Sequence, residues 1–136
     1  AHHAFDIDQP GKDSWRHRQA GCTEVLVSSG IRWALMHELR GAAEMTLPQA
    51  IAQLSPCDLV LVEGYKAFPM PKLEVWRPAV GKPVLQPGDP YIVGMATDDV
   101  PAAMAVTALP VFRLDDIDAI ATFVLEHATS WPSGLT

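Results

Sequence analysis

The stretch Asp58-Leu59-Val60-Leu61-Val62-Glu63-Gly64 decides the fold that we expect for this chain. Its apolar run is too short for a buried helix and is bounded by Pro56 and Gly64, which predicts a buried parallel strand. Open α/β sheets bind ligands at the carboxyl ends of their strands, where Glu63 would emerge. A carboxylate there can bind Mg²⁺ directly or through water. A strand that merely ends in a solvated glutamate fits the same pattern.

The bulk composition predicts one soluble globular domain. The 136 residues are 49% hydrophobic and 19% charged, with a net charge of −6. No apolar run approaches the roughly 18 residues of a membrane span, and the N-terminus has no apolar signal core. We therefore expect a cytoplasmic protein without membrane contact. Cys22 and Cys57 stand far apart without metal-site spacing, which favours buried free thiols over a disulfide or zinc site.

Basic residues are concentrated in one segment, residues 66–82. This segment holds Lys66, Lys72, Arg77 and Lys82 against one acid, whereas the chain after Pro83 is strongly acidic. A short basic segment beside an acidic body favours a small anionic ligand or an acidic partner over nucleic acid, which needs many phosphate contacts. We therefore expect no nucleic-acid partner. A solvated loop with incidental lysines is the alternative.

Helix caps, turns and periodicity predict alternating elements along the chain. We expect a helix capped by Asp13 or Ser14 and ending at Gly21, and a second helix capped by Thr46. We expect an antiparallel hairpin over 23–28 and 31–37 and further strands over 91–96 and 111–112. A short edge strand is expected over 73–76, inside a proline-rich loop. The last expected element is an amphipathic helix that begins at Asp115 or Asp116.

The N-terminal stretch is dense in polar groups that could contact Mg²⁺ or phosphate. These groups are Asp6, Asp8, Lys12, Asp13 and Ser14. Solvated side chains near a terminus are the simpler interpretation. Gly11-Lys12 fails the pattern of a phosphate-binding loop, which requires G-x-x-x-x-G-K-[ST].

Several motifs in one order make the chain similar to a known family. They are His2-His3, Asp6-x-Asp8-x-Pro10-Gly11-Lys12-Asp13-Ser14, Ala20-Gly21, Arg32-Trp33-Ala34-Leu35-Met36, Asp58 to Lys66, Ala96-Thr97-Asp98 and Leu114-Asp115. Together they resemble the molybdopterin-guanine dinucleotide biosynthesis protein B (MobB) family over nearly the whole chain. The resemblance implies a GTP-binding, P-loop NTPase-like α/β protein with weak GTPase activity, commonly a homodimer. Such a protein assists a guanylyltransferase partner in attaching GMP to molybdopterin.

The chain departs from the family pattern at its start. Family members begin with a strand, a phosphate-binding loop, a helix and a second strand, which no segment here supplies. We therefore expect a mostly parallel sheet with flanking helices and an antiparallel hairpin, lacking that unit, as a single α/β domain over residues 1–136. Without the loop's N–H groups, lysine and hydroxyl, GTP should bind poorly. A fragment of a longer protein and a natural short form are both consistent with this pattern.

The resemblance also suggests roles for individual residues. Asp6, Asp8, Lys12, Asp13 and Ser14 would line the nucleotide site, with Asp6 as a second candidate Mg²⁺ ligand. Glu63, followed by Gly64, would position Mg²⁺ or the attacking water. From charge, we assign Lys66, Lys72 and Arg77 to the pterin phosphate or the partner protein. Asp98 or Asp99 is the candidate for reading guanine, and His2 and His3 either touch the site or are solvated.

Two hypotheses of different class follow. The chain is either a GTP-binding component of molybdenum cofactor maturation or a catalytically silent adapter for the transferase or the pterin. An upstream phosphate-binding loop in the native gene product would favour the first. Failure to bind nucleotide and pterin would favour a third class, an unrelated metal-binding or small-molecule domain. An uncovered sheet edge or apolar face also leads us to expect self-association.

Overall fold

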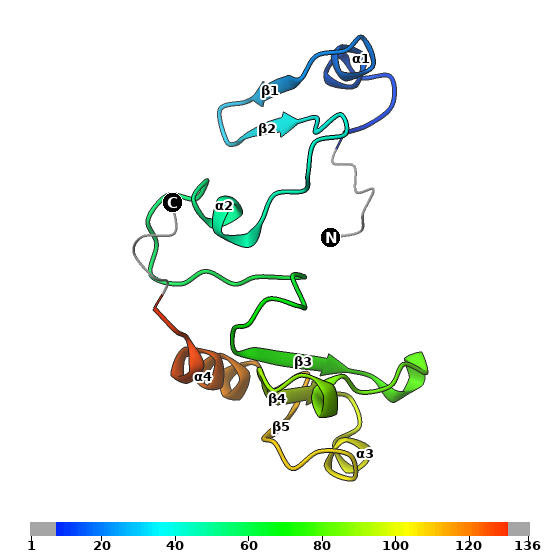
Figure 1. The fold of residues 1–136 in the computed structure, drawn as a ribbon, viewed down its shortest axis with the longest axis vertical. Helices are drawn as coiled ribbons and strands as arrows, with labels where there is room; N and C mark the ends of the chain where they lie inside the picture. Colours follow the sequence, from blue (N-terminus) through cyan, green and yellow to red (C-terminus); the bar gives the residue numbers. More distant parts are fainter. Residues whose placement is uncertain (1–7, 131–136) are drawn as a thin grey trace. The chain divides into compact units, whose positions relative to one another are not determined.

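The computed structural model describes residues 8–130, which divide into two compact units. The first unit holds residues 8–56 and 61–65, and the second holds residues 57–60 and 66–130. Figure 1 shows the elements of each unit along the chain. A single domain over residues 1–136 stays a prediction.

The first unit contains a helix, a hairpin and a second short helix: α1 (Asp13–Gln19), β1 (Glu24–Ser28), β2 (Trp33–His37) and α2 (Leu47–Ile51). The strands β1 and β2 are antiparallel, with a register from Glu24 opposite His37 to Ser28 opposite Trp33. The Ser29 N–H donates to the Arg32 carbonyl over 2.9 Å and closes the turn. The predicted hairpin is confirmed, with its second strand beginning two residues later than expected.

The ends of the two helices partly follow the expected signals. Lys12 occupies the N-cap position of α1 without a side-chain cap, so the prediction that Asp13 or Ser14 caps this helix is wrong. The chain leaves α1 through Gly21 at φ +105°, a left-handed conformation that glycine adopts readily. Thr46 and Gln49 form the reciprocal capping box of α2, as the sequence predicted for Thr46.

The second unit is built on a parallel sheet of order β3-β4-β5. Its elements are β3 (Lys72–Trp76), the 3₁₀ turns η1 (Pro78–Val80) and η2 (Gln86–Gly88), β4 (Ile92–Thr97), α3 (Val100–Met104), β5 (Val111–Arg113) and α4 (Ile117–His127). All three strands and the last helix were predicted, and α3 was not. The expected mixed α/β class, with a parallel sheet, flanking helices and an antiparallel hairpin, is confirmed.

The core of the second unit lies where α4 meets the sheet. Phe123 of α4 is buried, and its ring centroid lies 4.8 Å from that of Phe112 on β5 and 4.0 Å from that of His127. The central strand β4 contributes Gly94 to the same contact. A Cβ at Gly94 would lie 2.8 Å from two ring atoms of Phe123. The helix therefore approaches the sheet closely because β4 carries no side chain at this position.

The predicted strand over residues 58–64 is wrong. This segment has no regular secondary structure, and within residues 8–130 none of its backbone groups forms a backbone hydrogen bond. Leu59, Val60 and Leu61 are exposed. A strand requires a neighbour whose N–H and C=O groups pair with its own. No strand of the described residues pairs with residues 58–64, so this apolar run forms no ladder of backbone hydrogen bonds.

Two further expectations concern the cysteines and the membrane. Cys22 and Cys57 are free thiols as expected, but both are exposed, so the prediction that they are buried is wrong. Each lies in irregular backbone and not on the apolar side of an element. Among the helices of residues 8–130, none is long and apolar enough to cross a bilayer.

Candidate functional site

Asp8 and Ser14, which we assigned to the nucleotide site, are linked by a hydrogen bond in the first unit. The Ser14 hydroxyl donates to Asp8 Oδ1 over 2.8 Å, and Arg18 Nη1 lies 3.3 Å from Asp8 Oδ2. The Asp8 side chain is only 6% exposed. Arg18 also donates through Nε to Glu38 over 2.6 Å. This network ties the start of α1 to the end of the hairpin.

Lys12 and Asp13, two further N-terminal candidates, form no side-chain hydrogen bond or ion pair with Asp8, Ser14 or Arg18 within the described residues. Lys12 and Asp13 are exposed, and Asp13 lies 3.9 Å from Arg16 in a solvated ion pair. Asp6, His2 and His3 lie outside the described residues. The Asp8 carboxylate is occupied by a hydroxyl, a guanidinium and the Gln9 N–H. It therefore holds the local fold together and is a poor candidate for a metal ligand.

Glu63 stands at a sharp change of chain direction. Its side chain is exposed, and the two residues after it adopt left-handed backbone, with φ +89° at Gly64 and +45° at Tyr65. A bulky residue in this conformation is uncommon and is held by its surroundings. Here the Tyr65 hydroxyl donates to the Met45 carbonyl over 3.0 Å. The turn is therefore tied to residue 45 through Tyr65, and the Glu63 carboxylate lies exposed just before it.

The donor set of the described residues limits how Mg²⁺ can be held. Residues 8–130 contain no cluster of three or more metal-binding side chains. A nucleotide-bound Mg²⁺, however, takes only one or two protein carboxylates and completes its shell with phosphate and water. Glu63 fits that role, because no described group hydrogen-bonds to its carboxylate. Asp8 does not fit it.

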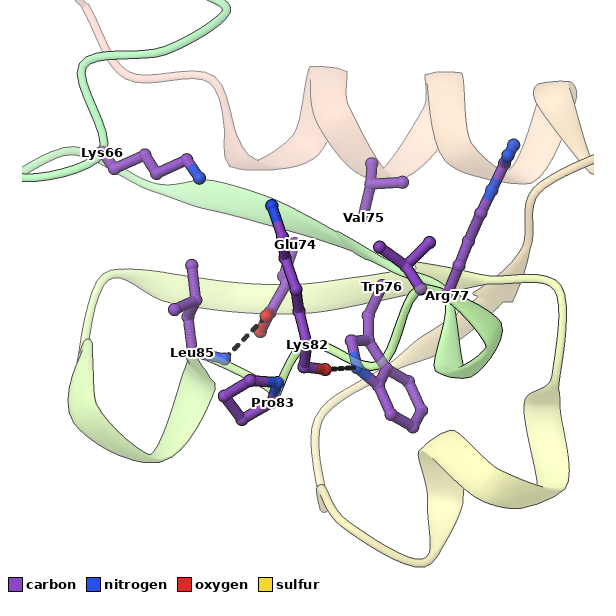
Figure 2. A pocket seen from close by; sticks show the side chains of 9 residues that line it. Lys66, Glu74, Val75, Trp76, Arg77, Lys82, Pro83 and Leu85 are labelled. Carbon is purple, nitrogen blue, oxygen red and sulfur yellow. Dashed lines mark hydrogen bonds between the residues drawn. The ribbon is translucent and has the colours of Figure 1, made fainter.

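The second unit carries a pocket of about 300 Å³ beside β3. Figure 2 shows it between the strand and the returning loop, with Glu74 and Trp76 on one side of β3 and Val75 on the other. Two of the three predicted cations, Lys66 and Arg77, line it. The full lining is Lys66, Glu74, Val75, Trp76, Arg77, Val80, Lys82, Pro83 and Leu85.

Two side chains of β3 fix the loop that forms the far wall. The buried Glu74 carboxylate accepts the N–H groups of Leu85 and Gln86 over 2.7 and 3.0 Å. Trp76 Nε1 donates to the Lys82 carbonyl over 2.9 Å. Figure 2 draws two of these hydrogen bonds, Leu85 to Glu74 and Trp76 to Lys82. The pocket is therefore held open by specific bonds, and the oxygens of Glu74 are already engaged.

Lys72, the third predicted cation, is not part of this pocket. Its Nζ donates to Asp89 Oδ2 over 2.9 Å and lies 5.2 Å from the centre of the Tyr91 ring. Both charged side chains are largely covered, at 17% and 25% exposed. Lys72 therefore joins the start of β3 to the turn before β4, a structural role for a residue that we had assigned to binding.

The Lys72 hydrogen bond, aided by the Tyr91 N–H, lowers the pKa of Asp89 below its ordinary value of 3.8. A lowered folded pKa adds stability above the unfolded pKa, and this stability is lost as the pH falls through the folded value. We expect Asp89→Asn to lose less stability than the unchanged chain between about pH 5 and about pH 2. Urea unfolding across this window tests it, with Asp58→Asn as the exposed control. Equal acid sensitivity of Asp89→Asn and the unchanged chain would contradict it.

The two acids considered for reading guanine are both engaged. Asp99 caps α3 by accepting the Ala102 N–H over 3.0 Å. Asp98 Oδ2 lies 3.8 Å from Arg77 Nε at the rim of the pocket. Guanine recognition by Asp98 or Asp99 stays a prediction.

Comparison with known proteins identifies the family. The family model described as "Molybdopterin guanine dinucleotide synthesis protein B" (MobB) matches residues 1–98. The chain belongs to the MobB family. Proteins named "Molybdopterin-guanine dinucleotide biosynthesis adapter protein" resemble it in Escherichia coli K12 (36% identity over 128 residues) and Haemophilus influenzae (35% over 127 residues). These alignments cover 92% and 93% of the chain and 71% and 70% of the two relatives.

The structure of this MobB-family chain adds residues that sequence reasoning did not select. Trp76, Lys82 and Glu74 belong to the pocket that Lys66 and Arg77 line. The sequence carried one usable signal, since alternation along β3 places Glu74 and Trp76 on one face of the strand. Lys82 had no such signal, because its place depends on the course of a proline-rich loop.

Proposed function

We propose that this chain acts as an adapter in the attachment of GMP to molybdopterin, binding a guanylyltransferase partner. Family membership carries this proposal, together with two relatives that are named adapter proteins and align with more than nine tenths of the chain. The basic rim around the pocket of the second unit supports it, because an exposed cationic patch suits a phosphorylated ligand or an acidic partner surface.

The adapter role is tested by direct binding to a purified molybdopterin guanylyltransferase. Surface plasmon resonance should show saturable binding, and the transferase should attach GMP to molybdopterin faster when the chain is present. Raised salt should weaken the complex, because exposed charges are screened within a Debye length of about 8–10 Å. No binding and no change in the transfer rate would reject the adapter role.

The finer part of the proposal is GTP binding with Mg²⁺ at Glu63, with weak hydrolysis in the intact protein. The exposed Glu63 carboxylate beside the left-handed Gly64 and Tyr65 supports it. Calorimetric titration of GTP and Mg²⁺ into the chain and into the complete gene product tests it. We expect Glu63→Ala to remove the Mg²⁺ dependence and the hydrolysis, and Glu44→Ala, another exposed glutamate, to leave both unchanged. Mg²⁺-dependent hydrolysis by Glu63→Ala would contradict the assignment.

We also propose that the chain forms a homodimer in a cytoplasmic setting. The hairpin supports self-association, because Leu26 and Leu35 lie opposite each other on one face and are 64% and 52% exposed, beside Trp33 at 70%. Light scattering at tens of micromolar should give a dimer mass for the chain and a monomer mass for the double variant Leu26→Asp, Leu35→Asp. Leu125→Asp, on the exposed side of α4, is the control. A monodisperse monomer before any substitution would contradict the dimer.

A further inference from the structure

The pocket beside β3 contains two lysines whose charges are not neutralised by nearby carboxylates. Lys66 and Lys82 both line it, and no described group forms a hydrogen bond or an ion pair with either ammonium group. Figure 2 shows the two side chains extending toward the same part of the pocket. The one carboxylate in the wall, Glu74, already accepts two backbone N–H groups. Both lysines are exposed, so their ammonium groups are accessible to an anion from solvent.

The third cation that lines the pocket, Arg77, lies apart from the two lysines. It follows β3, its side chain is 58% exposed, and its Nε lies 3.8 Å from Asp98 Oδ2. In Figure 2 it extends to the same side of β3 as Val75, away from Lys66 and Lys82. The anion site is therefore limited to the two lysines.

The remaining wall of the pocket is apolar and includes an aromatic ring. The Trp76 indole is held in place by its bond to the Lys82 carbonyl, while Val80, Pro83 and Leu85 extend the apolar surface. A fixed indole is a good surface for stacking a flat heterocycle. The volume of about 300 Å³ lies at the lower end for small-molecule sites, which span roughly 300–1,000 Å³. A small ligand suits this pocket better than a protein segment does.

From this geometry we infer that the pocket binds a small ligand that combines a phosphate group with a flat heterocyclic ring. The phosphate lies between Lys66 and Lys82, and the ring lies against Trp76. Lys82 replaces Lys72 in the cation set that the sequence suggested, since Lys72 is engaged by Asp89. The inference rests on the proposed function only for the choice of a pterin as the ring to test.

Calorimetric titration of the chain with three probes tests the inference. The probes are the phosphate ester of 6-hydroxymethylpterin, the same pterin without phosphate, and inorganic phosphate. We expect the ester to bind at least tenfold tighter than either part alone, because both halves of the pocket then contribute. Equal affinity of the ester and inorganic phosphate would overturn the ring site, and equal affinity of the two pterins would overturn the phosphate site.

Variants locate the binding in this pocket. Lys82→Ala and Lys66→Ala should each weaken the ester about tenfold, as expected for the loss of a charge-assisted hydrogen bond, and Lys82→Arg should restore most of it. Trp76→Leu should weaken the ester but not inorganic phosphate. The matched control for the lysine variants is Arg16→Ala, an exposed cation of the first unit. Binding that none of the pocket variants changes would overturn the inference.

The same variants separate this inference from the proposed function. GMP serves as a fourth probe. If GMP binds as tightly as the pterin ester and Lys82→Ala weakens both affinities equally, the pocket is a site for a phosphate and a flat ring, but a pterin is not its specific ligand. If the variants weaken only the guanylyltransferase complex and no small probe binds, the pocket contacts a protein surface, and the inference fails while the adapter role stands.

Discussion

Replacing Phe123 by alanine is expected to lower the free energy of unfolding of the second unit by about 3–5 kcal/mol. Phe123 is 7% exposed, and its ring packs on Phe112 of β5 and on His127 of its own helix. Alanine would remove these contacts and leave a cavity that the short strands could fill only in part. Urea unfolding followed by circular dichroism measures the loss. Leu125→Ala, on the same helix at 63% exposed, should cost under about 1 kcal/mol.

Gly94 provides an independent test of the same contact. Gly94→Ala alone should cost about 1–3 kcal/mol, because its Cβ would lie 2.8 Å from the Phe123 ring and 3.2 Å from Leu73 Cδ1. With Phe123→Ala already present, most of this cost should disappear, so the double-mutant cycle gives a large coupling energy. Gly88→Ala has open space around the added methyl and serves as the control. The same cost for Gly94→Ala in both backgrounds would show that Phe123 is not what excludes the side chain.

Features set by neighbouring residues could be predicted from the sequence. The Thr46 cap depends on Gln49 three residues later, and the hairpin depends on a reversal at residues 29–32. Asp116, one of the two caps proposed for α4, accepts the Ala119 N–H over 3.2 Å. In each case the stabilising partner lies within four residues, so the local pattern contains the whole interaction.

Features that depend on distant partners could not be predicted in this way. The run Leu59 to Val62 has the composition of a buried strand, but a strand forms only where another strand pairs with it, and composition does not report that. Glu63 is exposed at the end of this run, although the strand that we expected to end there does not form. The residue pattern therefore selected Glu63 as a candidate but gave the wrong secondary structure for the residues before it.

The candidate pocket shows the same limit for side chains. The charge bias over residues 66–82 led us to expect an anion-binding segment, and three of its four basic residues line one pocket. The bias could not tell Lys82 from Lys72, because the difference lies in their surroundings. Asp89, seventeen residues after Lys72, engages that lysine, while nothing described engages Lys82. Formal charge identifies candidates, and only tertiary structure shows which charges are already paired.

Arg18→Ala is expected to destabilise the first unit by about 3 kcal/mol or more. Arg18 is 15% exposed and bridges Asp8, 6% exposed, and Glu38, 33% exposed. Removing the guanidinium takes a charged donor away from a covered carboxylate, which costs more than the pair contributes when intact. Hydrogen exchange of the β1 and β2 amides measures the effect on this unit alone, since the hairpin is the element that Arg18 joins to α1. Arg16→Ala, on the exposed side of the same helix, should leave exchange almost unchanged.

Two further variants test whether the stability contributed by Arg18 depends on the planar geometry of its guanidinium or only on its positive charge. Arg18→Lys keeps the charge but cannot donate to Asp8 and Glu38 in separate directions from one planar group, so it should recover only part of the stability. Adding Glu38→Gln to Arg18→Ala should cost less than it does in the unchanged chain, because the glutamate has already lost its partner. Full recovery in Arg18→Lys, or strict additivity of the two substitutions, would mean that the network is a loose surface contact. The predicted pattern instead makes Asp8 a structural anchor of α1.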